Sequence, residues 1–95
     1  MIDREQIVSK LHKKIDEYSA DIDKLEEEIE KKKSEKRMEY HQEINELRIK
    51  RAEFENMLND LKKAGEESYD DLKQAAEKAG KSLSEGIKIA KSRFV

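Results

Sequence analysis

The sequence has no cysteine and no proline, and only three of its 95 residues are glycine. Without cysteine, the chain has neither a disulfide framework nor a thiolate metal site, and it suits a reducing compartment. Without proline, the strongest helix breaker is missing, and the first glycine is Gly65. No residue before Gly65 therefore forces a helix to end.

Apolar residues are scarce as well. They form 35% of the chain, aromatic residues form 5% with no Trp, and charged residues form 46%. An ordinary compact core needs more apolar material than this. Because the net charge is only −2 and the apolar residues recur at regular intervals, helices that pair along narrow stripes are favoured over disorder. We therefore predict an all-α protein.

The sequence also lacks a long apolar run. The N-terminus carries no apolar leader segment, and no stretch approaches the roughly 18 apolar residues that a membrane-spanning helix needs. We expect a soluble, cytoplasmic chain.

The first apolar stripe runs through residues 8–29 in steps of three and four residues. This spacing is typical of a coiled-coil seam, and the β-branched residues that alternate with Leu or Tyr favour a parallel dimer. However, the acidic block 21–30 directly precedes the basic block 31–37, which suits an antiparallel pair. Exposed charge pairs are too weak to decide between the two directions.

The seam is interrupted at Lys32 and Lys36 and resumes at Tyr40 and Ile44. Since no glycine or proline marks a turn there, we predict a long coiled-coil helix over residues 1–64, with a hairpin turn in the interrupted stretch as the alternative. The stripe is too narrow to be buried within one copy, so we predict an oligomeric helical assembly, a homo-oligomer with a dimer as the expected state. The predicted oligomer interface consists of Val8, Leu11, Ile15, Tyr18, Ile22, Leu25, Ile29, Ile44, Leu47, Phe54, Leu58 and Leu61.

A second stripe begins at Leu61 and has a period of eleven residues, close to three helical turns. The cations before Gly65 suit a helix end, and Ser68 suits the next N-cap. We therefore predict a break at residues 65–68 and a shorter amphipathic helix over 69–95, with an unbroken helix as the alternative. The apolar face of this tail contains Leu72, Ala76, Ala79, Leu83, Ile87, Ala90 and Phe94.

The tail is basic and its stripe is made largely of small residues. Residues 72–95 carry six positive and two negative charges. Small residues bury little area, so this helix should order only against a partner. The candidate partners are the long helix, another chain, an anionic membrane surface and a destabilised client protein.

Residues that could carry chemistry stand alone. His12 and His41 have no second histidine three or four residues away, and there is no glycine-rich phosphate loop. The carboxylates lie on solvated helix faces without a pocket, so we predict no enzyme, no catalytic residue, no metal and no cofactor. The basic cluster at 31–33 has acidic neighbours and no aromatic stacking platform, which does not favour nucleic-acid binding.

Several stretches resemble a known family. These are KLHKKIDEYSADIDKL (10–25), EYHQEINELRIKR (39–51), LNDLKKAGEESYDDLK (58–73) and AKSRF (90–94). They are similar to small bacterial coiled-coil proteins described as stress-response proteins of unknown mechanism. In addition, KQAAEKAGK (73–81) resembles the eleven-residue repeat of late-embryogenesis-abundant proteins, which are associated with desiccation. Both resemblances imply a stress-related role without a catalytic residue.

The sequence thus favours a non-enzymatic helical interaction protein that associates with itself and acts in stress. Two alternatives stay open. The tail could fold on a membrane surface or on a client protein, or the chain could complete a bundle with a different protein.

Overall fold

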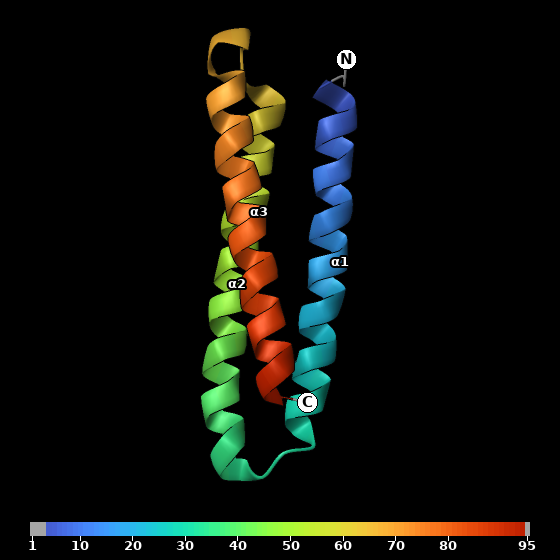
Figure 1. Ribbon diagram of the computed structural model, residues 1–95, viewed down its shortest axis with the longest axis vertical. Coiled ribbons are helices and arrows are strands. Elements are labelled where there is room, and N and C mark those ends of the chain that lie inside the picture. The colour runs from blue at the N-terminus through green and yellow to red at the C-terminus, as the bar shows by residue number, and fades with distance from the viewer. Residues whose placement is uncertain (1–3, 95) are drawn as a thin grey trace.

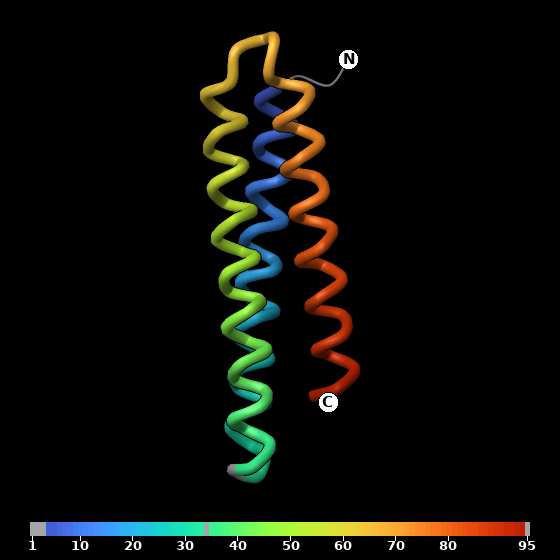
Figure 2. Tube along the Cα trace, turned by 90° about the vertical axis from the view of Figure 1, so that its left-hand side faces the viewer, coloured from blue at the N-terminus to red at the C-terminus, as the bar shows by residue number. Residues whose placement is uncertain are grey.

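The chain forms three long helices that run down, up and down in one bundle (Figure 1). The computed structural model describes residues 4–94, apart from the side chain of Ser34. The helices are α1 (Arg4–Glu30), α2 (Ser34–Lys63) and α3 (Glu66–Phe94). The bundle measures 51 × 18 × 17 Å, and in Figure 2 the three helices keep the same long axis when viewed from the side. The all-α prediction is confirmed for this part of the chain.

The predicted continuous helix over residues 1–64 is wrong, because the chain folds back after α1. The amides of Lys31 and Lys32 donate to the carbonyls of Glu28 and Ile29 at 3.2 and 2.9 Å, which tightens the last turn. Lys33 is extended, with φ −65° and ψ 149°. The seam positions here are lysines, so a straight helix gains little burial, whereas folding back covers both apolar stripes. The alternative prediction, a hairpin turn in the interrupted stretch of the seam, is the one that the structure shows.

A second break lies at Ala64 and Gly65, and α3 begins at Glu66 instead of after residue 68. Ala64 is extended, and its amide donates to the carbonyl of Leu61 at 3.3 Å. The turn is held from the other end of the chain by Arg4, whose guanidinium donates to the Ala64 carbonyl oxygen at 2.7 Å. The N-terminus of α1 is thereby tied to the α2–α3 turn.

The core lies along the bundle axis and takes side chains from all three helices. Every residue of the predicted oligomer interface is buried within this single chain except Tyr18, which is half-buried. The tail face is covered as well, with Leu72 and Ala79 half-buried and its other five residues buried. The expectation that one copy cannot bury these stripes is therefore wrong, since three folded-back helices supply each stripe with two partners. Whether copies also associate stays a prediction.

Two glycines bring α3 close to α2. A Cβ atom at Gly80 would come within 2.9 Å of the Phe54 ring, and one at Gly86 within 2.8 Å of Leu47 Cδ2. Only a residue without a side chain fits such an approach without a shift of its neighbour. The α2–α3 pair is consequently packed tightly, and α1 completes the bundle from one side (Figure 1).

Candidate binding groove

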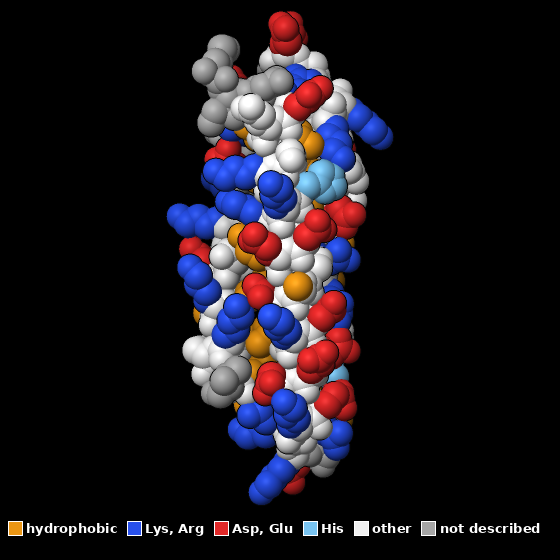
Figure 3. Space-filling model, turned by 90° about the vertical axis from the view of Figure 1, so that its right-hand side faces the viewer, with side chains coloured by type: hydrophobic (Ala, Val, Ile, Leu, Met, Phe, Trp, Pro, Cys, Tyr) orange, Lys and Arg blue, Asp and Glu red, His pale blue; other side chains and the backbone are white. Residues whose placement is uncertain are grey.

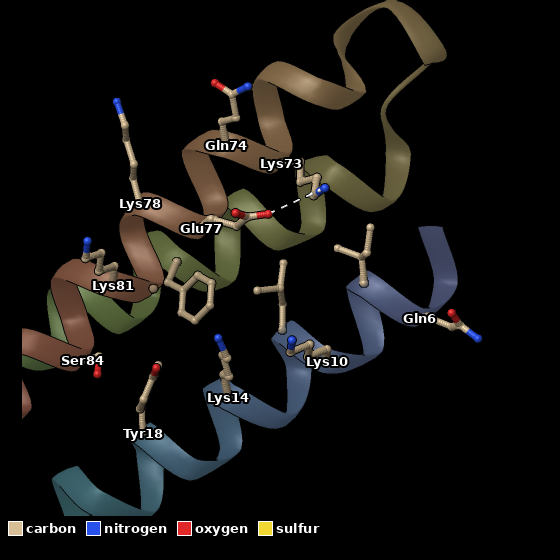
Figure 4. Close-up of a pocket in the computed structure, with 14 residues that line it drawn as sticks. Gln6, Lys10, Lys14, Tyr18, Lys73, Gln74, Glu77, Lys78, Lys81 and Ser84 are labelled. Atoms are coloured by element: carbon tan, nitrogen blue, oxygen red, sulfur yellow. Dashed lines mark ion pairs between the residues drawn. The ribbon is translucent and has the colours of Figure 1, made fainter. Parts of the chain in front are cut away.

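An open groove of about 1130 Å³ lies between α1 and α3, with α2 at its floor (Figure 4). Of its lining, Ile7, Leu11, Tyr18, Phe54 and Gly80 form the floor. The rims are polar and consist of Gln6, Lys10 and Lys14 on α1 and of Lys73, Gln74, Glu77, Lys78, Lys81 and Ser84 on α3.

The floor is apolar and belongs to the core of the bundle. Leu11 is 5% exposed and Phe54 is fully buried, while Ile7 and Tyr18 are half-buried. The rings of Tyr18 and Phe54 lie 6.3 Å apart between centroids, at an interplanar angle of 41°. An occupant of the groove would therefore meet aliphatic and aromatic side chains at its base.

The groove is open because α3 presents small residues at this level. Ala76, Ala79 and Gly80 follow one another on the packed face of α3, and Gly80 itself lines the groove. Gly80 also lets α3 settle on Phe54 of α2, which leaves the space next to α1 unfilled. Further along the bundle, Lys91 of α3 pairs with Asp21 of α1 at 3.5 Å. Opposite charges thus join the two helices below the groove.

Around the groove itself, positive charge predominates. Five lysines and one glutamate line it, and Glu77 pairs with Lys73 of its own helix at 3.9 Å. Over residues 4–94, no carboxylate oxygen lies within 4 Å of the ammonium groups of Lys10, Lys14, Lys78 or Lys81, which form the other lysines of the groove. Like charges on both rims repel and create a positive potential in the concave space between them. On the side of the molecule that carries α1, Figure 3 shows Lys and Arg side chains interspersed with Asp and Glu side chains around apolar surface.

The other two helix pairs are joined by complementary groups. Between α1 and α2, Arg48 contacts Glu26 and lies 3.6 Å from Asp23. Between α2 and α3, Arg93 contacts Glu43 and lies 3.2 Å from Glu39. The α1–α3 pair has its ion pair, Lys91–Asp21, outside the groove.

The two histidines lie in ordinary surface contacts. His41 Nε2 is 3.3 Å from a carboxylate oxygen of Glu30, and His12 Nε2 is 2.6 Å from Lys62 Nζ. Within residues 4–94, no group of three His, Asp or Glu side chains is placed to hold a metal ion. In the same range, none of the helices is long and apolar enough to cross a membrane.

The sequence-predicted sites and the groove overlap only in part. Leu11, Tyr18 and Phe54 belong to the predicted interface and also form the groove floor. The rim lysines of α1 were not predicted. The sequence does indicate one of them, because Lys14 lies on a flank of the 8–29 stripe. That this flank faces lysines of α3 is known only from the packed structure.

Comparison with known proteins adds no relative. No protein-family model, no curated protein and no solved structure matches the chain.

Proposed function

We propose that this protein is a non-enzymatic binding module that holds a helical segment of another protein in the α1–α3 groove. The observation that carries the proposal is the combination of an apolar floor with polar rims along two parallel-running helices. Grooves of this kind accept a helix by burying its apolar face and meeting its polar flanks. The stress-related role that the resemblance implies would be exercised through this binding.

The dimensions of the groove suit a helix. Its lining spans residues 6–18 on α1 and 73–84 on α3. At 1.5 Å per residue, each side is about 16–18 Å long, or about three helical turns. A helix laid between α1 and α3 would pack against both of them above the floor residue Phe54 of α2, and would convert the structure into a four-helix bundle.

The proposal is tested with a photo-crosslinking amino acid placed at Gln74, on the groove rim, or at Gln42, an exposed glutamine of α2 away from the groove. In the cells that produce the protein, we expect a discrete adduct from position 74 that position 42 does not form. The adduct should disappear when Lys14→Glu and Lys81→Glu are added. Identical adducts from both positions would contradict the proposal.

Self-association through exchange of α1 is a second candidate function. The α1–α2 turn contains three lysines and neither glycine nor proline, so the same residues can also be helical. With a straightened turn, α1 of each copy could occupy its usual place on α2 and α3 of the other copy, with the same core contacts. This route would give the homodimer predicted from the seam without a new interface. Light scattering at rising protein concentration tests it, and a constant monomer mass would contradict it.

A further inference from the structure

We infer that the partner in the groove is an acidic amphipathic helix with carboxylates on both flanks of its apolar stripe. This inference rests on the proposed function and specifies the chemistry of the partner. Its basis is the juxtaposition of Lys10 and Lys14 on α1 with Lys78 and Lys81 on α3, on opposite sides of an apolar floor.

The lysines recur at the spacing of a helix on both rims. Lys10 and Lys14 are four residues apart, and Lys78 and Lys81 are three residues apart. Side chains at these spacings lie on one face of their helix, so each rim offers two cations about one turn apart. A helix between the rims presents one flank to each, as the charged flanks of a coiled-coil helix do. Glutamates at three- or four-residue spacing on both flanks would match both pairs.

Glu77 interrupts this pattern, because it lies next to Lys78 in the sequence and midway between Lys73 and Lys81 on α3. Its carboxylate pairs with Lys73 at 3.9 Å, and Figure 4 shows this pair on the α3 side, above the α1 lysines. The positive charge without a carboxylate neighbour therefore belongs to Lys10 and Lys14 on α1 and to Lys78 and Lys81 on α3, of which Lys78 extends away from α1 in Figure 4. We expect the acidic residues of the partner to lie at this level.

The floor defines the third face of the partner. Leu11 and Phe54 are buried and Tyr18 is half-buried, so a partner helix would cover them with aliphatic or aromatic side chains over about three turns. Tyr18 offers a ring with a polar end, which suits the edge of such a contact. An acidic chain without an apolar stripe would leave this floor uncovered.

The shape of the site favours a protein helix over the other anions. Proteins bind a membrane surface by inserting apolar side chains that project from them, whereas here the apolar residues lie at the base of a concavity. Single-stranded nucleic acid needs exposed aromatic rings for stacking, and Phe54 is fully buried.

The test titrates the full chain with three fluorescent peptides of equal length, followed by fluorescence anisotropy. One is an amphipathic helix with Glu flanks, the second has the same stripe with Lys flanks, and the third has the Glu composition with its apolar residues scattered around the helix. We expect the first to bind at least about tenfold more tightly than the others, and its affinity to fall with added salt. Equal binding of all three, or preference for the Lys peptide, would overturn the inference.

Paired variants locate the binding. Lys14→Glu with Lys81→Glu reverses the charge of both rims and should reduce binding of the Glu peptide about tenfold or more. The matched control is Lys13→Glu with Lys88→Glu, which makes the same charge change on exposed lysines outside the groove. The rim variant should also gain affinity for the Lys peptide, a result that mere loss of folding cannot produce. Equal effects of the two double variants would overturn the inference.

Additional measurements distinguish a failure of this inference from a failure of the proposed function. Anionic vesicles and single-stranded RNA are titrated in the same buffer, and binding of either that depends on Lys14 and Lys81 would replace the acidic helix as the occupant. If the Glu peptide fails while the Gln74 crosslink remains specific, the groove binds a protein of different chemistry. If the crosslink also fails, the proposed function falls with the inference.

Discussion

Gly80 of α3 lies directly against the ring of Phe54 of α2, so that a Cβ atom at position 80 would come 2.9 Å from Phe54 Cζ and 3.3 Å from two neighbouring ring carbons. Both residues are buried, and the ring also faces Tyr18 of α1. This contact sets how closely α3 approaches α2 and, through that approach, how much space remains next to α1.

Gly80→Ala should destabilise the bundle by about 1 kcal/mol. Alanine favours a helix by up to about 1 kcal/mol over glycine, but overpacking a buried ring typically costs about 1–3 kcal/mol. Gly65→Ala is the matched control, because nothing lies within 4 Å of a Cβ atom there and the backbone has no positive φ. That variant should be neutral or slightly stabilising. Urea unfolding followed by circular dichroism measures both, and equal destabilisation would contradict the contact.

Ile22→Asp should unfold the monomeric three-helix bundle. Ile22 is fully buried, and an aspartate there would lose the packing of a large side chain and place a charge in the core, at a cost of about 3–5 kcal/mol. Ile49 is 59% exposed, so Ile49→Asp makes the same chemical change on the surface and should alter the free energy of unfolding by at most about 0.5 kcal/mol. Similar thermal unfolding of the two variants would show that the seam is not buried as described.

Tyr69→Phe should leave stability unchanged or raise it slightly. The Tyr69 hydroxyl oxygen is buried without a hydrogen-bond partner among the described residues, so its removal leaves no group unpaired. The ring keeps its place under the guanidinium of Arg4, whose Cζ lies 4.5 Å from the ring centroid. Arg4→Ala, in contrast, removes both that contact and the hydrogen bond to Ala64, and should destabilise by about 1–2 kcal/mol. Denaturant midpoints rank the two variants, and a larger loss for Tyr69→Phe would contradict this order.

Lys33→Pro should preserve the folded monomer. The φ angle of Lys33 is −65°, the value to which proline is restricted, and the residue precedes the first turn of α2. The substitution should be neutral or stabilise by about 0.4–1 kcal/mol, because it restricts the unfolded chain. It also disfavours a helix through the turn, so any dimer formed by exchange of α1 should be lost. Light scattering and thermal unfolding of the same sample report the two effects, and a dimer that survives the substitution would exclude the exchange.

The apolar stripes were predictable because their spacing alone marks one face of a helix. Residues such as Ile22 and Leu58 must be buried whatever covers them, and both are fully buried. What covers them was not predictable, since an identical seam can be satisfied by a second copy or by the same chain folded back. The turn at 31–33 likewise carries no glycine or proline, so local sequence did not disclose the fold-back that tertiary packing favours.

The same division applies to the groove. The sequence by itself determined a helical, highly charged chain with stripes that require burial, because periodicity and composition are local properties. Only the tertiary structure decided that Lys14 and Lys81, 67 residues apart, line one concavity above Phe54. Their meeting depends on two chain reversals and on the close approach of Gly80 to α2, and these follow from the free energy of packing all three helices together.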